Sequence, residues 1–315
     1  MKSIKKPIVI VGAGFGGMTV ASTLKRLNPS LPILVIDSEE QFIFKPLMYE
    51  VLSEELPMWE TSPEFKKIFS SLGITFLRNS VTKIRFDEKI IELNNKLKLD
   101  YEFLILCTGS VSNNFSVKGA DENCYFFNNL SDLIKIKSLL KKLQNSNEKK
   151  NLFVIGAGPS GVEIACKIND IYKNKFDISI VERSNEILSQ NKIFNREEAE
   201  KALEKRQINL LLNSTVKEIS DQKISIFNNS EIKDLDQDIV IWTAGVKPNL
   251  TYIEENVKQI DGRILVNEKF QISNFNNSFA IGDIALIKGM EDLPLTAQVA
   301  MQQGNHLAKN IELLC

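Results

Sequence analysis

The sequence contains one pattern twice, and this pattern constrains the folds that the chain can adopt. Each copy has a short apolar run, a turn of the form Gly-x-Gly-x-x-Gly, a helical stretch, a second apolar run and an acidic residue. The first copy runs from Ile8 to Asp37 and the second from Leu152 to Glu182. Such apolar runs are typical of buried strands, and the stretch between them is typical of a covering helix. The pattern therefore predicts two α/β units with parallel strands.

Each glycine-rich turn has the parts that bind the pyrophosphate of a dinucleotide. The first glycine makes a tight turn, the second lets the backbone approach the pyrophosphate, and the third lets helix and strand pack closely. The helix N-terminus stabilises phosphate charge, and an acid about 20 residues further on accepts hydrogen bonds from ribose hydroxyls. The residues concerned are Gly12, Ala13, Gly14, Phe15, Gly16, Gly17 and Asp37 in the first copy, and Gly156, Gly158, Gly161 and Glu182 in the second. Two complete copies favour two dinucleotide sites over chance glycine turns.

The spacing of the two turns predicts the domain organisation. They begin 144 positions apart, at Gly12 and Gly156, which leaves room for a domain around each. We expect residues 1–125 to form the first part of one domain, 126–268 a second domain, and 269–315 a return to the first. The predicted fold is α/β with two Rossmann-type FAD/NAD(P)-binding domains, the second inserted in the first, a plan that resembles glutathione reductase.

A late Gly-Asp pair indicates which dinucleotide each domain binds. Gly282 and Asp283 follow a short apolar run far downstream of both turns. In flavoproteins with this two-domain plan, such a pair returns to the first domain and touches the ribityl chain and phosphate of the flavin. We therefore expect FAD in the first domain and NADH or NADPH in the second. The alternative is that Asp283 is a plain turn residue after a strand.

Further candidates follow predicted strands or begin predicted helices. Thr108 and Gly109 follow the apolar run 103–106, and Gly245 follows the run 239–242. The last helix, expected over 296–314, begins where its dipole can stabilise negative charge on a flavin, and Thr296 also suits an ordinary cap.

Two acids of the second domain bear on the coenzyme. Glu163 lies two residues after the second turn, in what we expect to be the first turn of the helix, where it either faces a nicotinamide or simply complements the helix dipole. Glu182 favours NADH because a carboxylate repels a 2′-phosphate. Arg183 beside it weakens that inference, because an arginine can accept this phosphate.

Composition argues against several other classes of function. Lys and Arg total 39 and Asp and Glu total 40, which gives no support for nucleic-acid binding. No apolar stretch reaches the roughly 20 residues of a membrane span, and the apolar run before the first turn is shorter than we expect of a signal peptide. The basic stretch 131–144 suits a solvated linker helix better than a lipid-docking one.

The histidine and cysteine content argues against two further classes of site. With His306 as the sole histidine, a Ser-His-Asp hydrolase is disfavoured. Four cysteines without a CxxC pair indicate buried thiols of a reducing compartment and no metal site: Cys107, Cys124, Cys166 and Cys315.

Five segments of the sequence resemble type II NAD(P)H:quinone oxidoreductases. One of them, 296–303, is similar to the AQxAxQ quinone-site motif of that family. Two longer stretches, 42–60 and 195–212, resemble its cyanobacterial and chloroplast branch, which is associated with reduction of demethylphylloquinone and related prenylquinones. The five segments are 8–17, 44–50, 156–161, 242–249 and 296–303.

The resemblance implies roles for individual residues. It places Val81 against the adenine, and Asp37, which is Glu in many relatives, on the ribose of FAD. It makes Glu163 the acid of the active site and puts Gln298 and Gln302 at the quinone head group, so that these three are the expected catalytic residues. Together with the glycines and acids above, it implies cofactor contacts from Lys45, Val81, Thr108, Gly109, Gly245, Gly282, Asp283, Ala297 and Gln298.

The resemblance also implies an activity and a location. Electrons pass from NAD(P)H through flavin to a membrane quinone of the prenyl-naphthoquinone or plastoquinone type, without proton pumping. The protein is expected on the cytoplasmic side, either soluble or peripheral to the plasma or thylakoid membrane. Family members continue into amphipathic membrane-anchoring helices, and we expect that segment to be missing from a chain that ends at Cys315. Membrane contact through such a segment and homodimer formation stay open.

The alternatives to this activity are another flavin reductase linked to a pyridine nucleotide, or a protein that binds both dinucleotides without catalysis. A disulfide reductase needs a CxxxxC pair beside the flavin, and the sequence has none. A sulfide:quinone oxidoreductase needs two cysteines that meet in space, for which Cys107 and Cys124 are the candidates, although the complete second turn favours NAD(P)H. A non-catalytic redox sensor binds FAD and NAD but signals through a partner.

Overall fold

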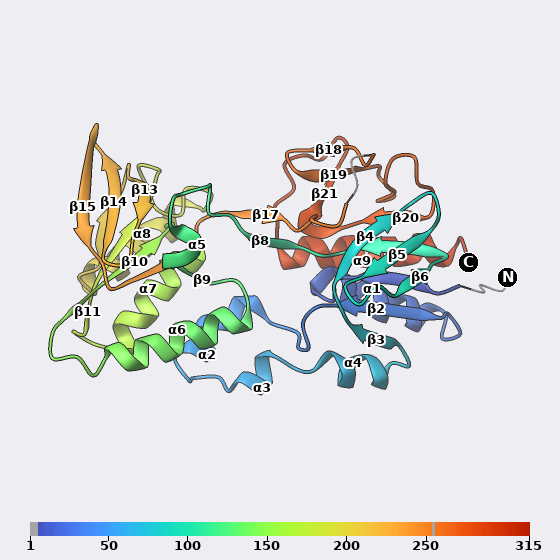
Figure 1. Ribbon diagram of the computed structural model, residues 1–315, viewed down its shortest axis with the longest axis horizontal. Helices are drawn as coiled ribbons and strands as arrows, with labels where there is room; N and C mark the ends of the chain where they lie inside the picture. Colours follow the sequence, from blue (N-terminus) through green and yellow to red (C-terminus); the bar gives the residue numbers. More distant parts are fainter. Residues whose placement is uncertain (1–5, 254–255) are drawn as a thin grey trace. The chain divides into compact units, whose positions relative to one another are not determined.

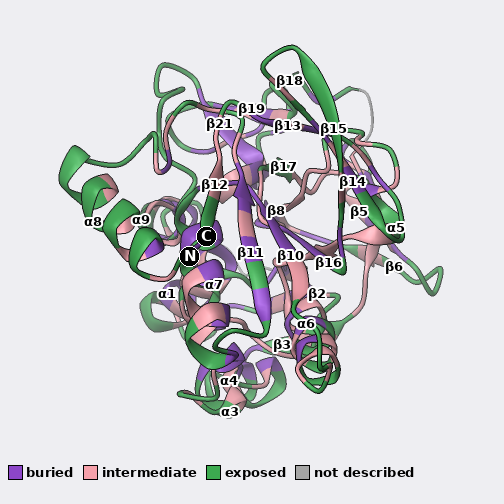
Figure 2. Ribbon diagram, turned by 90° about the vertical axis from the view of Figure 1, so that its left-hand side faces the viewer, coloured by how far each residue is buried: buried purple, intermediate pink, exposed green. Residues whose placement is uncertain are grey.

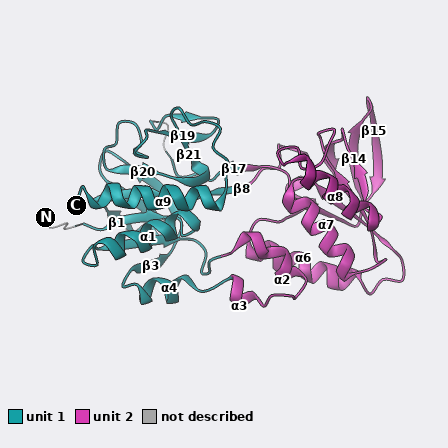
Figure 3. Cartoon of the chain, turned by 180° about the vertical axis from the view of Figure 1, so that it is seen from behind, with its two compact units in different colours: residues 1–42, 62–111, 247–315 teal, residues 43–61, 112–246 magenta. Residues whose placement is uncertain are grey.

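The computed structural model describes residues 6–253 and 256–315, which divide into two compact units (Figure 3). Unit 1 comprises residues 1–42, 62–111 and 247–315, and unit 2 comprises residues 43–61 and 112–246. The chain passes between the units at both ends of segment 43–61 and again along two short strands that pair with each other, β8 (Ser110–Ser112) and β17 (Val246–Pro248). Unit 2 is therefore inserted in unit 1.

Unit 1 is built around a five-stranded parallel sheet whose strands consist mainly of buried apolar residues. Strands covered on both faces need such continuous apolar runs. The first glycine-rich turn follows the central strand β1 and leads into α1 (Phe15–Leu27), which packs along α9 (Ala297–Glu312) (Figure 1). In spatial order the strands are β20 (Ser278–Ala280), β7 (Phe103–Leu106), β1 (Ile8–Val11), β2 (Ile33–Asp37) and β3 (Thr75–Arg78).

Two smaller sheets and two short helices complete unit 1. One sheet is antiparallel and consists of β4 (Val81–Arg85), β5 (Ile90–Leu93) and β6 (Lys98–Asp100). The other consists of β18 (Gln259–Ile260), β19 (Arg263–Val266) and β21 (Ala285–Ile287). The short helices are α4 (Phe65–Ser71) and the 3-10 turn η2 (Gly282–Ile284).

Unit 2 repeats the plan, with the second turn between its central strand β10 and α7 (Pro159–Ile171). Its sheet is also parallel, in the order β12 (Asn209–Leu211), β11 (Phe176–Val181), β10 (Lys150–Ile155), β16 (Ile239–Trp242) and β9 (Tyr125–Phe126). All of β16 is buried, whereas α8 (Ile193–Lys205) is largely exposed (Figure 2). An antiparallel sheet follows, formed by β13 (Thr215–Ile219), β14 (Lys223–Asn228) and β15 (Glu231–Asp236).

The remaining helices of unit 2 lie before the second turn. They are η1 (Lys45–Leu47), α2 (Met48–Leu52), α3 (Met58–Thr61), α5 (Ala120–Asn123) and α6 (Leu130–Leu143). The first three belong to the segment 43–61, which leaves unit 1 and returns to it. Met48, Val51 and Leu52 are buried in the same apolar core as the inner faces of α6 and α7, which explains why this segment belongs to unit 2.

The predicted fold class, with its inserted second domain, is confirmed, but the units differ from the expected residue ranges. The second domain was expected at 126–268, whereas unit 2 takes up 112–246 and the detached segment 43–61. Two of the four crossings between the units lie in the paired strands β8 and β17, and the other two lie at the ends of segment 43–61. The polar stretch 145–150, whose composition resembles a linker, lies within unit 2, between α6 and β10. Across the residues that the structure describes, every helix is too short or too polar to span a membrane.

Candidate dinucleotide sites

Of the three glycines that make the Gly-x-Gly-x-x-Gly pattern of the first turn, packing requires two and leaves the middle one open. Gly12 has φ +97°, and a Cβ there would lie 2.4 Å from the carbonyl oxygen of Cys107. A Cβ on Gly17 would lie 1.9 Å from the carbonyl oxygen of Gly12. A Cβ on Gly14, which has φ −67° at the N-cap of α1, would meet no described atom within 4 Å. Packing therefore requires Gly12 and Gly17, whereas Gly14 faces open space.

The second turn shows the same division. Gly156 has φ +101°, and a Cβ there would lie 2.9 Å from the Cα of Ala244. A Cβ on Gly161 would lie 1.9 Å from the carbonyl oxygen of Gly156, whereas one on Gly158 would meet nothing described within 4 Å. At each turn the space left by the middle glycine borders a helix N-terminus, where backbone N–H groups favour an anion. Both turns therefore fit the pyrophosphate of a dinucleotide.

The two acids at the strand ends are held in the same way. Asp37 accepts hydrogen bonds from the backbone N–H of Ala13, at 2.6 Å, and of Glu39, at 2.9 Å. Burial raises the pKa of the Asp37 carboxyl, and these backbone donors partly oppose that effect.

In unit 2, Glu182 accepts from the backbone N–H of Ala157 and from that of Ser184, both at 2.8 Å. Each acid is thus tied to the residue that follows the first glycine of its own turn. This arrangement fixes the carboxylate next to the turn, where a ribose attached to the bound pyrophosphate would lie.

The late Gly-Asp pair returns to unit 1, as the sequence predicts. Gly282, at φ +74°, begins η2, and the Asp283 carboxylate accepts a hydrogen bond of 2.7 Å from the Ser110 hydroxyl. The backbone N–H of Gly282 donates to Oε1 of Gln303 at 2.7 Å. Gln303 is a buried polar residue that the sequence reasoning missed. Its signal was available, because it lies on the buried stripe of α9 with Ala300 and Leu307.

The helix α9 is closely fitted against α1 and the first turn. A Cβ on Gly304 would lie 2.9 Å from the carbonyl oxygen of Gly16, so the two backbones approach closely there. The Thr23 hydroxyl donates to the Asn305 side chain at 2.8 Å. The predicted cap is confirmed, since the Thr296 side chain accepts from the N–H of Val299 at 3.3 Å.

The residues expected at the flavin and quinone lie on the other side of the same helix. Ala297 is its first residue and half-buried, and Gln298 and Gln302 are exposed one turn apart. In sequence, Gln303 differs from Gln302 by a single position, but it points into the protein while Gln302 points to solvent.

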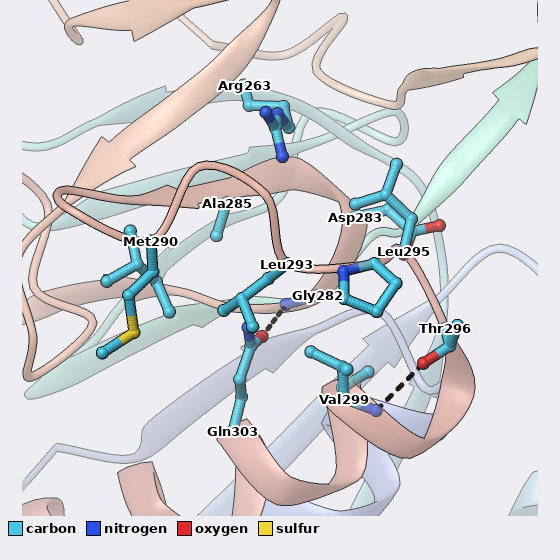
Figure 4. Close-up of a pocket in the computed structure, with 13 residues that line it drawn as sticks. Arg263, Gly282, Asp283, Ala285, Met290, Leu293, Leu295, Thr296, Val299 and Gln303 are labelled. Carbon is cyan, nitrogen blue, oxygen red and sulfur yellow. Dashed lines mark hydrogen bonds between the residues drawn. The ribbon is translucent and has the colours of Figure 1, made fainter. Parts of the chain in front are cut away.

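A pocket lies beside the start of α9 (Figure 4). In the close-up, Gln303 reaches up to Gly282 from the helix, and Arg263 extends towards the pocket from the opposite side. Gln298 and Gln302 are not among the described residues that line it. These are Arg263, Gly282, Asp283, Ala285, Ile287, Met290, Leu293, Pro294, Leu295, Thr296, Val299, Ala300 and Gln303.

The remaining candidates in unit 1 lie in loops and at a strand end. The Thr108 hydroxyl donates to the carbonyl oxygen of Asn249 at 2.8 Å and also contacts the Tyr252 hydroxyl. The adjacent Gly109 has φ +63° and open space at its Cβ position. Val81 is half-buried at the first position of β4. Thr108 and Gly109 thus form a loop that side-chain and backbone contacts hold in place.

Two other candidates belong to unit 2. Gly245 has φ +66°, a conformation that favours glycine, and a Cβ there would lie 2.4 Å from the exposed ring of Phe115. Lys45 donates a hydrogen bond of 2.8 Å to the Asn128 side chain. The sequence placed Lys45 in the first domain, and the structure groups it with unit 2.

Glu163 is the fifth residue of α7, so it lies past the first turn in which we expected it. Because the helix dipole acts mainly within that turn, this position weakens the interpretation of Glu163 as a simple dipole partner. Glu163 is an exposed residue, but part of its carboxyl is removed from water, and this desolvation raises the pKa of the carboxyl. A raised pKa is typical of a carboxyl group that exchanges protons in a reaction.

The cysteines and the histidine are placed in structural roles. Burial raises the pKa of Cys124 to about 12, and it also raises that of Cys107, which lies beneath Gly17. Both are free thiols, and among the described residues no cluster of ligands suits a metal ion. His306 packs edge-on against Phe270, with the ring centroids 5.7 Å apart. A redox pair of cysteines therefore gains no support.

Comparison with known proteins gives the chain its family. The model for the pyridine nucleotide-disulphide oxidoreductases matches residues 6–304. The chain is 31% identical to the alternative NAD(P)H-ubiquinone oxidoreductase C1 of Arabidopsis thaliana, over 98% of this chain and 67% of the relative. It is 30% identical to the demethylphylloquinone reductase NdbB of Synechocystis sp., over 99% of this chain and 80% of the relative.

A solved structure shows the same fold. NDH2 of Plasmodium falciparum in complex with NADH superposes with a TM-score of 0.85, at 21% identity, over 98% of this chain and 83% of that one. The twin turns, their acids and the matches along nearly the whole sequence agree. The chain belongs to the pyridine nucleotide-disulphide oxidoreductase family and, within it, to the type II NAD(P)H:quinone oxidoreductases.

Proposed function

We propose that this protein transfers electrons from NADH or NADPH to a prenylated quinone, with FAD held by unit 1 and the nicotinamide coenzyme by unit 2. The observation that carries the proposal is the division of the glycines. In both units the protein's own packing explains the outer glycines but not Gly14 or Gly158. A bound pyrophosphate at each turn explains both.

The chain's residues bind and orient the two dinucleotides. At the first site the backbone around Gly14 faces the pyrophosphate, and Asp37 accepts from a ribose. Asp283, held by Ser110, binds the ribityl chain. Gln303 supports this contact because it accepts a hydrogen bond from the backbone N–H of Gly282, the residue before Asp283. The N-terminus of α9 at Ala297 places positive dipole charge near the flavin ring.

The second site follows the same logic, with Gly158 at the pyrophosphate and Glu182 at the ribose. Because both oxygens of Glu182 accept backbone hydrogen bonds, its charge is fixed at the place where a 2′-phosphate would lie. This arrangement favours NADH over NADPH.

When bound, FAD supplies the two-electron chemistry that links a hydride donor to a quinone. The protein supplies alignment and a proton. Glu163 is the acid of the site, and the raised pKa of its carboxyl lets it hold a proton closer to neutral pH than an ordinary glutamate. The exposed Gln298 and Gln302 are polar groups that can donate hydrogen bonds to quinone oxygens.

The acceptor we propose is of the demethylphylloquinone type, in line with the name of the Synechocystis relative. Such an acceptor resides in lipid, so the protein would meet it as a peripheral protein on the cytoplasmic side of the membrane. Exposed apolar side chains near the start of α9 support contact with an apolar acceptor: Met290, Leu293, Leu295 and Met301.

The test is anaerobic rapid mixing of the purified yellow protein with NADH or NADPH, followed by a naphthoquinone. We expect flavin absorbance to bleach faster with NADH and to return on addition of the quinone. Bleaching by sulfide in place of either coenzyme would favour the sulfide:quinone alternative. Slow turnover with every acceptor would favour a redox sensor.

A further inference from the structure

The segment 43–61 is fastened to unit 2 by two acids that follow α2 and point to different helices. Glu54, in the left-handed conformation at φ +63°, pairs with Lys137 at 2.9 Å and Lys141 at 2.7 Å, both on α6. The next residue, Glu55, pairs with Lys167 on α7 at 2.7 Å. The helix α2 packs against both α6 and α7, so these ion pairs add to an apolar contact.

The pair between Glu55 and Lys167 replaces one that the sequence of α7 favours. Lys167 lies four residues after Glu163, which is the better orientation for a Glu–Lys pair on a helix surface. Instead, its ammonium lies 5.8 Å from the centre of the Tyr49 ring and binds Glu55. The Lys167 side chain is only 19% exposed, so it is held in this place. Among the residues that the structure describes, Glu163 forms no ion pair.

On the two packed helices, Tyr49 and Cys166 are affected by the Glu163 charge, and neither side chain carries a positive charge. From α2, Tyr49 lies close enough that the Glu163 charge raises the pKa of its phenol, after burial and ahead of Glu50. On α7, the pKa of Cys166 is raised chiefly by burial, with a smaller contribution from Glu163. Arg206 acts on Cys166, but it is paired with Asp170 through two hydrogen bonds of 2.8 Å.

We propose that Glu55 is a positioning residue that holds Lys167 away from Glu163 and so keeps the Glu163 carboxyl available as a proton donor beside Tyr49. This inference rests on the active-site role proposed for Glu163. A cation that moved next to Glu163 would favour the carboxylate and remove the proton from it.

The stoichiometry of the reaction gives that proton a use. NAD(P)H, one proton and a quinone yield NAD(P)⁺ and a quinol. The coenzyme's hydride accounts for two electrons and one hydrogen, so one further proton must reach a quinone oxygen. In that step the O–H bond of the Glu163 carboxyl breaks, a bond to the quinone oxygen forms, and the carboxylate takes a proton back from water.

The experiment compares four variants of the FAD-loaded protein. They are Glu55→Gln, the double variant Glu55→Gln with Lys167→Met, Glu54→Gln, and Glu163→Gln. Glu54→Gln is the matched control, because it weakens docking of the same segment without releasing Lys167. Two readouts are used: the pH dependence of turnover with NADH and a naphthoquinone, and the carboxyl titration followed by ¹³C NMR of glutamate-labelled protein, assigned by comparison with Glu163→Gln.

We expect Glu55→Gln to lower the pKa of Glu163 by about one unit, the lower end of the effect of a nearby opposite charge. The alkaline fall in turnover should move to lower pH by the same amount. The double variant should restore both readouts, and Glu54→Gln should leave them unchanged.

Two results overturn the inference. One is an unchanged Glu163 titration in Glu55→Gln, and the other is an equal shift in Glu54→Gln, which would reduce the effect to docking of the segment. A wild-type pH profile in Glu163→Gln contradicts instead the role proposed for Glu163. The two failures are therefore distinguishable.

Discussion

Gln303 accepts a hydrogen bond of 2.7 Å from the backbone N–H of Gly282, and this contact links α9 to the turn that carries Asp283. The two residues are 21 positions apart and meet only because α9 lies along the edge of the first turn. The neighbouring Gln302 is exposed. The pair Gln302 and Gln303 therefore offers a matched comparison of an outward and an inward glutamine.

Replacing Gln303 by Leu should weaken FAD retention and lower the free energy of unfolding by about 1–3 kcal/mol, because the Gly282 donor loses its partner. Denaturant unfolding and flavin content after gel filtration measure the two effects. The control Gln302→Leu should change the free energy of unfolding by no more than about 0.5 kcal/mol. Equal losses in both variants would contradict a special role for the buried glutamine.

The middle glycines should tolerate alanine in folding but not in binding. Gly14→Ala should leave the apoprotein as stable as the wild type, or more stable by up to about 1 kcal/mol, because φ is negative and the space is open. It should nevertheless be isolated with less flavin. Gly158→Ala should keep its flavin and show a raised KM for NADH.

A matched control for this pair is Gly17→Ala, in which the new Cβ would overlap the Gly12 carbonyl and prevent folding. Full flavin content in Gly14→Ala would show that no phosphate approaches that glycine.

Coenzyme preference should depend on Glu182. Replacing it by Gln keeps the side-chain length but removes the charge that opposes a 2′-phosphate. The preference for NADH, as a ratio of kcat/KM values, should fall at least about tenfold, which corresponds to about 1.4 kcal/mol. Steady-state kinetics with both coenzymes test this. Arg183→Ala in the same background should reverse part of the gain with NADPH, and an unchanged ratio in Glu182→Gln would place the determinant elsewhere.

Docking of the segment 43–61 should weaken in acid. Lys141 and Lys137, which pair with Glu54, lower the pKa of the Glu54 carboxyl from the ordinary 4.5 to about 2. A lowered pKa stabilises the folded state above the ordinary value, and this contribution is lost as pH falls towards 2. Urea unfolding should therefore separate wild type from Glu54→Gln at pH 6 and bring them together near pH 2. The difference at pH 6 should be small, because the carboxyl is exposed and its lysine partners are screened.

Cys124 should be dispensable. Because burial raises its pKa to about 12, it stays a thiol at neutral pH and is a poor nucleophile. The variant Cys124→Ala should retain turnover with NADH and a naphthoquinone within about twofold, since packing changes of this kind cost little. Loss of turnover together with intact flavin content would revive the sulfide:quinone alternative.

Much of the fold could be predicted because its signals are local. The spacing within each Gly-x-Gly-x-x-Gly turn, the apolar runs on either side and the acid at the end of the second strand all lie within about 30 residues of sequence. The physical constraints act over the same range: a tight turn, close helix–strand packing and a carboxylate that accepts a hydrogen bond from the glycine-rich turn of its own copy. The Thr296 cap was predictable for the same reason.

The domain boundaries and several site contacts could not be read from local signals. The segment 43–61 carries apolar residues that suit either unit, and only packing of Met48, Val51 and Leu52 assigns it to unit 2. Lys45 lies in that segment and therefore belongs to unit 2, whereas the sequence analysis placed it in the first domain.

By itself, the sequence determined the twin dinucleotide-binding plan, because each cradle is made from one continuous stretch of chain. Only the tertiary structure decided which glutamine of α9 accepts the hydrogen bond from Gly282 and which glycines have open space for a ligand. It also decided that Lys167 pairs with Glu55 and not with Glu163. Those choices depend on contacts between residues far apart in sequence, such as Glu55 and Lys167, 112 positions apart. A side chain's partner is set by which helices pack together, and that is a property of the folded chain.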